Sequence, residues 1–283
     1  MALKTVIEVN NVSVTYRALN KRYGKLALKN VTLPVYEGKI TCLMGESGCG
    51  KTTLLRVLNG MSMLLSGVEV TVEGEILYRG KNIYGGGVSF EELRRKVTYV
   101  QQSPYPFPSS VWENVAYGPY IWGIHDSKEL DKIVERSLKK ADLWDRIKSI
   151  KEARNTGANA LSGGQKQRLE IACALAIEPK VMLMDESTAS LDPKTTGHIQ
   201  TLIKKLVADE GLTVVIVTHD LTYAYNMADY VAYLEPTSEG DDDKEEGFSS
   251  YGMVEEFGTH DQIFNHPQSA RTKKYVARRP KGD

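Results

Sequence analysis

The chain has 283 residues, which is long enough for one large domain or two lobes with a sizeable core. Lysine plus arginine and aspartate plus glutamate number 36 each, so the overall charge does not favour nucleic acid as a partner. The three cysteines have no zinc or disulfide spacing, which is typical of a reducing compartment. No apolar run approaches the ~18 residues of a membrane span, so we expect a soluble protein that reaches any membrane through partners.

The N-terminal third alternates between apolar and polar residues, which is typical of β-strands. Alternating stretches that predict a small antiparallel sheet cover residues 5–17, 26–40 and 68–83. The first stretch includes Glu8, which is unlike a signal peptide. Ser89 and Glu92 then have the spacing of a capping box ahead of a short helix, and residues 96–102 predict another strand.

The middle of the chain, from about Pro104 to Ala176, predicts helices. Apolar residues at helical spacing are Leu130, Ile133, Val134, Leu138 and Leu143. Three short apolar runs follow, at 180–186, 211–220 and 230–235, with helical stretches between them. This alternation predicts a parallel sheet, to which the buried strand "ITCLM" also belongs.

Two charged segments stand apart from these elements. Residues 236–250 form an acidic, low-complexity insert, and residues 271–283 form a basic tail. We interpret the insert as a solvated hairpin loop, with a regulatory or partner site as the alternative. We interpret the tail as a solvated end, with contact to anionic lipid or a membrane partner as the alternative.

The stretch "GESGCGKTT" lies between a predicted buried strand and a predicted helix, and it has the G-x-x-x-x-G-K-[ST] spacing of a phosphate-binding loop. Glycines let successive backbone amides point at one anion, a lysine reaches the outer phosphates, and a hydroxyl remains for Mg²⁺. The candidate contact residues are Gly45, Glu46, Ser47, Gly48, Cys49, Gly50, Lys51, Thr52 and Thr53. This loop alone predicts only that the chain binds a nucleoside triphosphate.

A second anion site is predicted by "LSGGQKQRLEIACALA", residues 161–176. Ser162, Gly163, Gly164 and Gln165 stand at the start of a predicted helix, where a hydroxyl and open amides favour an anion. Two phosphate sites require two phosphates, or one phosphate that two chains share.

These motifs together resemble those of the ATP-binding subunits of ABC transporters, over about residues 5–275. The resemblance implies an α/β fold of the P-loop NTPase (RecA-like) type, with a mostly parallel sheet core, an antiparallel β subdomain and a helical subdomain. We expect a single ABC ATPase domain over 1–283. Its expected parts are a core with the antiparallel sheet over 1–102 and 177–270, a helical subdomain over 103–176, and the basic tail over 271–283.

The resemblance also implies roles for single residues. It implies that two chains form a head-to-tail homodimer in which "LSGGQ" of one chain closes on ATP held by the other. Asp185 matches the Mg²⁺ partner and Glu186 matches the residue that polarises water, both at the end of a predicted strand. Asp192 matches a residue of the dimer interface, and His219 matches the histidine that contacts the γ-phosphate.

Two further positions have alternatives. Gln102 resembles the glutamine that links the Mg²⁺ site to the membrane subunit, with Gln101 as the alternative register. Tyr23 resembles the aromatic residue that stacks on adenine, with Tyr16 as the alternative. The implied Mg²⁺ ligands are Thr52, Gln102 and Asp185.

The chain departs from the common pattern at a few positions. It reads "DESTASLD", with Ser187 where proline is common and Ala189 and Ser190 in exchanged order. Cys173 stands where an arginine is common, which removes a possible salt bridge. The reacting groups are nevertheless present.

The transported solute is suggested by "QQSPYPFPSSVWENVAYGPYIWGI" and by the later "LWD", which resemble the ATPase subunits of phosphate importers. Prolines 104, 106 and 108 stiffen a surface loop that would face a membrane partner. The implied partners are two permease subunits at the cytoplasmic face of the cell membrane and, indirectly, an extracytoplasmic phosphate-binding protein. The alternative is an importer ATPase for another small solute or oxyanion.

Two other classes of protein are alternatives to a transport ATPase. A non-transport ABC ATPase, acting on DNA or in translation, usually adds coiled coils, a second ATPase half or nucleic-acid-binding segments, and none is evident here. A GTPase-type switch predicts a guanine-reading N-K-x-D, which is absent from the sequence. The sequence therefore favours a transport ATPase with ATP and Mg²⁺ as cofactors and no nucleic-acid partner.

Overall fold

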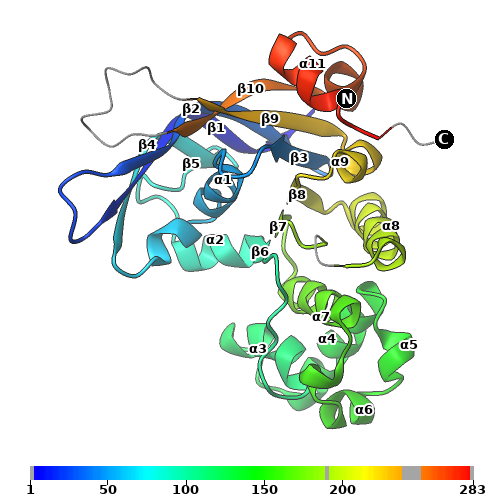
Figure 1. Cartoon of the computed structure of the whole chain (residues 1–283). Coiled ribbons are helices and arrows are strands. Elements are labelled where there is room, and N and C mark those ends of the chain that lie inside the picture. Colours follow the sequence, from blue (N-terminus) through cyan, green and yellow to red (C-terminus); the bar gives the residue numbers. More distant parts are fainter. Residues whose placement is uncertain (1–2, 189–190, 238–249, 281–283) are drawn as a thin grey trace. The chain divides into compact units, whose positions relative to one another are not determined.

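The structure is a computed structural model that describes residues 3–188, 191–237 and 250–280. The chain divides into two compact units, shown in Figure 1. Unit 1 comprises Met1–Arg94 and Thr213–Asp283, and unit 2 comprises Arg95–Leu212. Each unit is described here by itself.

The antiparallel part of unit 1 consists of three long strands and one short strand from the first third of the chain. Its strands are β1 (Thr5–Ala18), β2 (Lys25–Tyr36), β4 (Val68–Tyr78) and β5 (Lys81–Asn82). They lie in the order β5-β4-β1-β2. Val9 of β1 pairs with Leu33 of β2 on one side and with Ile76 of β4 on the other, and all three side chains are buried. The predicted antiparallel sheet is therefore confirmed.

The second part of the unit 1 sheet contains parallel strands. They are β3 (Ile40–Gly45), β8 (Thr213–Val217) and β9 (Tyr230–Thr237), and β3 pairs with β8 on one side and β9 on the other. Strand β10 (Tyr251–Thr259) pairs antiparallel with β9 and parallel with β2. Every residue of β3 and β8 is buried, which explains why both read as continuous apolar runs.

Short helices complete unit 1. They are α1 (Lys51–Val57), η1 (Met61–Leu64), α9 (Leu221–Met227), α10 (His260–Phe264) and α11 (Ala270–Val276), with α2 (Phe90–Lys96) at the boundary between the units. The capping box expected from Ser89 and Glu92 is only half formed. The Ser89 hydroxyl accepts the Glu92 N–H at 3.5 Å but donates to the carboxylate of Glu91 at 2.5 Å, so the reciprocal contact with Glu92 is replaced.

Unit 2 contains two parallel strands and a group of helices. The strands are β6 (Val97–Val100) and β7 (Val181–Asp185). The helical elements are α3 (Val111–Ile121), α4 (Ser127–Lys140), α5 (Trp144–Ile147), α6 (Ile150–Asn155), η2 (Ala158–Ala160), α7 (Gly163–Ala176) and α8 (Pro193–Glu210). The helices predicted between Pro104 and Ala176 are confirmed, and the predicted apolar stripe of α4 is buried.

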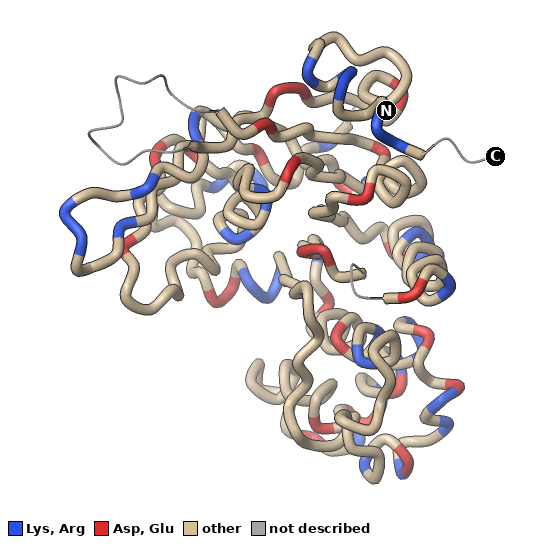
Figure 2. Tube along the Cα trace, viewed as in Figure 1, with Lys and Arg blue, Asp and Glu red and all other residues tan. Residues whose placement is uncertain are grey.

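The two charged segments have different outcomes. The acidic insert falls mainly on residues 238–249, which lie outside the described residues; Thr237 and Tyr251, on either side, pair across β9 and β10. The prediction of a solvated tail is wrong for α11, whose basic positions are marked in Figure 2. Thr272 and Tyr275 of this helix are buried, and the Tyr275 ring stacks on Tyr233 with centroids 4.6 Å apart. The tail is amphipathic, and its apolar side packs on the sheet.

In the described part of the chain, no helix combines the length and the apolar character that crossing a bilayer requires.

Candidate active site

The phosphate loop of unit 1 connects β3 to α1. Two of its glycines are required by the backbone: Gly45 has φ 149° and Gly50, which caps α1, has φ 89°. A Cβ on Gly45 would lie 2.2 Å from the carbonyl oxygen of Leu234 in β9. The loop therefore lies directly against the neighbouring strand, and only glycine permits this.

Lys51 is enclosed by its own loop. Its ammonium donates to the carbonyl oxygens of Gly45 at 2.8 Å and Glu46 at 2.7 Å, and its side chain is 5% exposed. The loop residues Glu46, Ser47 and Gly48 are exposed. A buried cation beneath an exposed ring of backbone amides is the arrangement that binds a phosphate anion.

Cys49 is the loop residue whose side chain points away from this exposed surface. The thiol is buried, and burial raises its pKa even though the nearby Lys51 ammonium acts in the opposite direction. Strand β10 lies against the backbone of Cys49, because a Cβ on Gly252 would lie 1.9 Å from the Cys49 carbonyl oxygen. Cys49 can therefore offer a ligand its backbone but not its thiol.

His219 lies at the same edge of the unit 1 sheet as the phosphate loop. It follows β8, which runs parallel to β3, and the Thr218 N–H donates to the Leu43 carbonyl of β3 at 3.2 Å. His219 is exposed, and the next residue, Asp220, caps α9 through the N–H groups of Thr222 and Tyr223. Ligands of parallel sheets bind at this carboxyl end of the strands.

The two candidate adenine-stacking residues differ in exposure. Tyr23 lies in the bend between β1 and β2 and is 57% exposed, with the Arg22 guanidinium 5.6 Å from its ring centroid. Tyr16 lies within β1, where it pairs with Lys25 and Val70. Only Tyr23 presents most of its surface to solvent.

In unit 2, the candidate acidic residues stand at the end of β7. Asp185 is buried, and its Oδ2 accepts a hydrogen bond from the Tyr99 hydroxyl at 2.6 Å. Tyr99 belongs to β6, which runs parallel to β7. Tyr99 has no motif of its own in the sequence, and its place on the strand beside an acidic strand end is the signal that could have identified it.

Glu186 adopts a left-handed backbone conformation, with φ 44°. This is unusual for a residue other than glycine, and such strain gathers at functional sites. The Gln102 amide donates through Nε2 to Glu186 Oε2 at 3.2 Å. Gln101 does not share this contact through its side chain; its backbone N–H donates to Glu170 Oε1 at 3.1 Å. The geometry thus places Gln102, rather than Gln101, against the candidate catalytic carboxylate.

The motif "LSGGQ" forms the N-terminal end of α7. Ser162 caps the helix by accepting the Gln165 N–H at 3.4 Å, and Gln165 Oε1 accepts the Ser162 N–H at 3.0 Å. A Cβ on Gly164 would lie 2.3 Å from Thr195 Cγ2 of α8, so this glycine permits close helix packing. Gly163 itself is exposed, so the positive end of the α7 dipole is accessible beside it.

Asp192 caps α8. It accepts the Thr195 N–H at 3.0 Å, and hydrogen bonds from Thr195 hold the pKa of Asp192 below its ordinary value. The side chain is exposed. Of the departures from the common loop sequence, Ser187 is buried, whereas Ala189 and Ser190 lie outside the described residues.

The candidate magnesium ligands are oxygen donors. In the described ranges, no three His, Cys, Asp or Glu side chains converge to hold a metal by themselves. Asp185 supplies a carboxylate, Gln102 an amide oxygen and Thr52 a hydroxyl, the hard donors that suit Mg²⁺ when phosphate oxygens complete its shell. This donor set fits a magnesium ion that arrives with a nucleotide.

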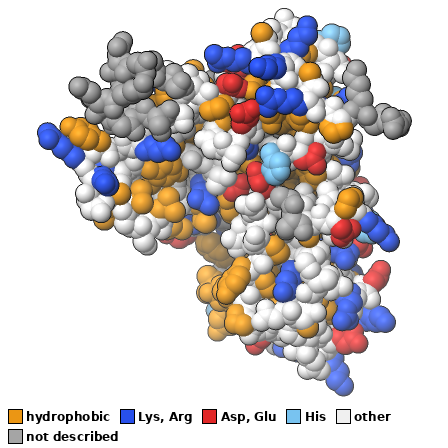
Figure 3. Space-filling view, in the orientation of Figure 1, with side chains coloured by type: hydrophobic (Ala, Val, Ile, Leu, Met, Phe, Trp, Pro, Cys, Tyr) orange, Lys and Arg blue, Asp and Glu red, His pale blue; other side chains and the backbone are white. Residues whose placement is uncertain are grey.

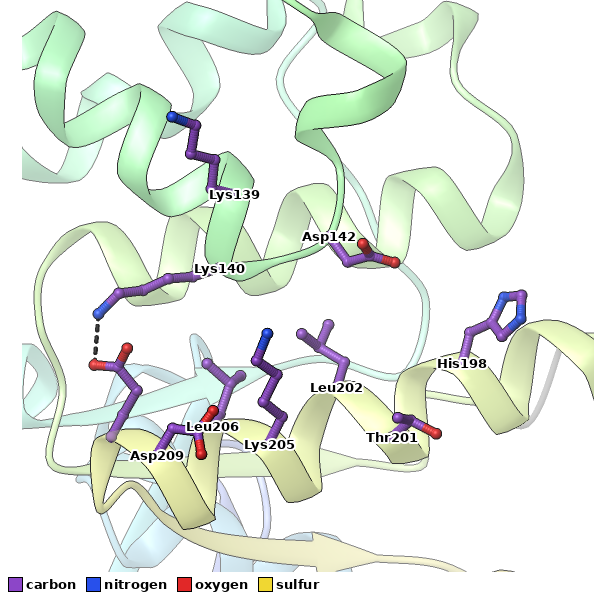
Figure 4. Close-up of a pocket in the computed structure, with 10 residues that line it drawn as sticks. Lys139, Lys140, Asp142, His198, Thr201, Leu202, Lys205, Leu206 and Asp209 are labelled. Carbon is purple, nitrogen blue, oxygen red and sulfur yellow. Dashed lines mark hydrogen bonds and ion pairs between the residues drawn. The ribbon is translucent and has the colours of Figure 1, made fainter.

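A wider cavity in unit 2, of about 540 Å³, lies between α4 and α8 and contains none of these residues. The Lys140 ammonium lies 2.6 Å from the Glu210 carboxylate, and a dashed line in Figure 4 marks this ion pair. The candidate active site is therefore distinct from this cavity.

Comparison with known proteins supports a single family. Residues 28–189 match the family model described as ABC transporter. Proteins named phosphate import ATP-binding protein PstB from Borrelia garinii subsp. bavariensis and Thermotoga maritima are both 42% identical. They align with 96% and 97% of this chain and with 94% and 98% of their own lengths. The Oceanobacillus iheyensis protein of that name is 44% identical, over 96% of this chain and 91% of its own.

Solved structures agree with the predicted fold class. CbiO1 from Clostridium perfringens, part of an ABC transporter complex, has a TM-score of 0.71 at 27% identity, covering 98% of this chain and 96% of its own. MJ0796, a dimeric bacterial ABC transporter cassette, has a TM-score of 0.68 at 32% identity, covering 90% and 98%. The expected P-loop NTPase fold, an α/β fold with a sheet core, is confirmed. The chain belongs to the ABC transporter family, as one of its ATP-binding proteins.

Proposed function

We propose that the chain is the ATP-hydrolysing subunit of an ABC importer and that it couples ATP binding, dimer closure and hydrolysis to the uptake of inorganic phosphate. The observation that carries this proposal is the 42–44% identity, over at least 96% of the chain, to proteins named for phosphate import. The accessible phosphate loop of unit 1 and the carboxylates of unit 2 supply the groups that such an ATPase needs.

The residues of unit 1 would bind ATP. The amides of the loop from Gly45 to Thr53 surround the phosphates, and Lys51 exchanges its two carbonyl partners for phosphate oxygens. Tyr23 offers its exposed ring to the adenine. His219 contributes its imidazole at the γ-phosphate end, where the β3 and β8 strands end together.

The residues of unit 2 would serve Mg²⁺ and water. Asp185 and Gln102, with Thr52 of unit 1, supply the oxygen ligands, and a bound Mg²⁺ would neutralise charge on the phosphates. Glu186 orients and polarises the attacking water. The hydrogen bond from Gln102 would hold one oxygen of that carboxylate in place.

The site would be completed by a second copy of the chain. The amides of Gly163 and Gly164, with Ser162 and Gln165, would form a second anion-binding helix end in addition to the phosphate loop. In a head-to-tail homodimer this end closes on the γ-phosphate held by the partner, with Asp192 at the interface. The two dimeric structures of the similar protein MJ0796 support the formation of a dimer.

The same proposal places the subunit at the cytoplasmic face of the cell membrane. Its partners would be two integral permease subunits and, indirectly, an extracytoplasmic phosphate-binding protein. No nucleic-acid partner is included, because the net charge is zero.

ATP-dependent uptake by vesicles that carry the whole importer complex tests this proposal. Labelled phosphate should enter the vesicles only when ATP is present on the side of the membrane that carries the subunit. Unlabelled phosphate should compete with this uptake better than sulfate or molybdate does. Equal competition by another oxyanion would reassign the substrate. Hydrolysis without any uptake, together with co-purification of DNA or ribosomes, would contradict a transport role.

A further inference from the structure

A groove in unit 2 lies beside the candidate catalytic residues of that unit. It has a volume of about 260 Å³ and is lined by β6, the segment after it, α3 and α7. Figure 3 shows hydrophobic side chains gathered over α3, and Tyr105, Phe107 and Tyr117 at the groove are 86%, 54% and 52% exposed. One carboxylate, that of Glu170 in α7, stands among these apolar groups.

Glu170 has a single described hydrogen bond. Its Oε1 accepts the backbone N–H of Gln101 at 3.1 Å, while its Oε2 is buried and accepts no hydrogen bond from any residue that the structure describes. Cys173, one turn further along α7, is not a cation and cannot balance the charge. Among the described residues no ion pair balances this partly buried carboxylate, which makes its burial costly. Its one hydrogen bond is therefore the feature to explain.

The pKa of Glu170 is consistent with this energetic cost of burial. Burial raises the pKa of the Glu170 carboxyl to about 7, and the hydrogen bond from Gln101 is what opposes that shift. Groups with perturbed pKa values gather at functional sites more often than elsewhere.

The contact continues from Gln101 to the catalytic carboxylate. Gln101 and Gln102 are consecutive exposed residues after β6. The first gives its N–H to Glu170, and the second gives its side-chain amide to Glu186 Oε2 at 3.2 Å. Two hydrogen bonds in series, joined by one peptide link, thus connect the groove to Glu186.

We propose that Glu170 is a positioning residue for hydrolysis: it anchors the Gln101 backbone so that the Gln102 amide stays on Glu186. This inference rests on the proposed catalytic role of Glu186. In this role Glu170 acts through Gln101 and Gln102 rather than on the reacting atoms.

The test compares Glu170→Ala and Glu170→Gln in the full chain, by steady-state ATP hydrolysis. Glu170→Ala removes the acceptor, so kcat should fall by roughly 10-fold or more, because a misplacement of about 1 Å can cost about 10²-fold. KM for ATP should stay close to native, since the phosphate loop and Tyr23 are untouched. Glu170→Gln keeps an acceptor oxygen for the Gln101 N–H and should keep most of kcat.

The matched control is Cys173→Ala, which changes the same helix and the same groove without touching Gln101. It should hydrolyse ATP at the native rate. Thermal unfolding of every variant separates a folding defect from a kinetic one. Native kcat in Glu170→Ala, an equal loss in both Glu170 variants, or a loss confined to KM would each overturn the proposal.

Glu186→Gln, measured beside these variants, distinguishes this inference from the proposed function. If Glu186→Gln abolishes hydrolysis while Glu170→Ala leaves it intact, only the positioning role of Glu170 is wrong. If Glu186→Gln hydrolyses ATP normally, the catalytic assignment itself fails and the role of Glu170 fails with it.

Discussion

The Arg278 guanidinium lies 2.7 Å from the Glu46 carboxylate, and this contact joins the end of the chain to the phosphate loop 232 residues earlier. Two further contacts hold this C-terminal segment in place. Burial raises the pKa of Tyr275 to about 12, and the nearby Gly45 backbone acts in the opposite direction. The Arg279 guanidinium lies 3.5 Å from the ring centroid of Tyr225. The C-terminal helix is therefore part of the support of the phosphate loop.

This packing predicts that Tyr275 contributes much more than Arg278 to the free energy of unfolding. Tyr275→Ala removes a buried ring and should lower the free energy of unfolding by about 3–5 kcal/mol, and it should also weaken ATP binding. Arg278→Ala breaks an ion pair between two half-exposed side chains, so its effect on stability should be about 1 kcal/mol or less. Urea unfolding and nucleotide titration of both variants measure this difference, and Tyr275→Phe is the matched control. A Tyr275→Ala variant as stable as the native chain would mean that α11 does not pack on the sheet.

The exposure of Tyr23 predicts its effect on nucleotide affinity. Tyr23→Ala should weaken ATP binding by about 1–3 kcal/mol, the range for stacking of one base, while Tyr23→Phe should bind normally. Tyr16→Ala should act on stability more than on affinity, because Tyr16 lies within β1. Equilibrium binding of a fluorescent ATP analogue distinguishes the two, and equal losses of affinity would refute the choice of Tyr23.

The raised pKa of Glu170 predicts a pH dependence of stability. The ordinary glutamate pKa is 4.5 and the folded value is about 7, so between these pH values the folded chain binds more protons than the unfolded chain. Stability therefore falls as pH rises through this window, by up to something on the order of 3 kcal/mol. Glu170→Gln cannot ionise and lacks this loss, so relative to native it should gain stability from about pH 5 to about pH 8. If the free energy of unfolding of the native chain and of Glu170→Gln changed with pH in the same way, Glu170 would not be buried as described.

Burial predicts that the cysteines react slowly. Burial raises the pKa of all three thiols, that of Cys173 to about 12, so little of the reactive thiolate is present near neutral pH. A chromogenic thiol reagent should modify the native chain far more slowly than the chain in urea, and MgATP should add little protection at Cys49. Rapid labelling of Cys49 in the native chain would show instead that the phosphate loop opens.

The features that could be predicted from the sequence are those with local signals. Alternation and apolar runs identified the strands around the phosphate loop, and the order of motifs along the chain pointed to one family. The spacing of Gly45, Gly50 and Lys51 reports a local backbone shape, which a strand and a helix on either side enforce. The sequence left Gln101 and Gln102 as alternatives, and only the hydrogen bond from Gln102 to Glu186 distinguishes them.

The features that could not be predicted depend on contacts between distant residues. Glu170 and Gln101 are 69 positions apart, and Arg278 and Glu46 are 232 positions apart. A basic segment such as "RTKKYVARR" has the composition of a solvated tail, and only the burial of Tyr275 shows that one face packs on the sheet. Similarly, the phosphate-loop pattern does not show that the Cys49 thiol turns into the core.

The roles assigned to Glu186 and to the helix end at Ser162 are tested most directly by one measurement on Glu186→Gln. The substitution keeps the shape of the side chain and its contact with Gln102 but removes the charge that polarises water. Hydrolysis should therefore fall by roughly 10²- to 10⁴-fold while ATP binding survives. With hydrolysis blocked, MgATP should hold two chains closed, so light scattering at high protein concentration should show monomers becoming dimers. Lys51→Ala, which lacks the phosphate anchor, should remain monomeric. Native hydrolysis by Glu186→Gln, or the absence of an ATP-dependent dimer in this variant, would contradict the shared-site mechanism.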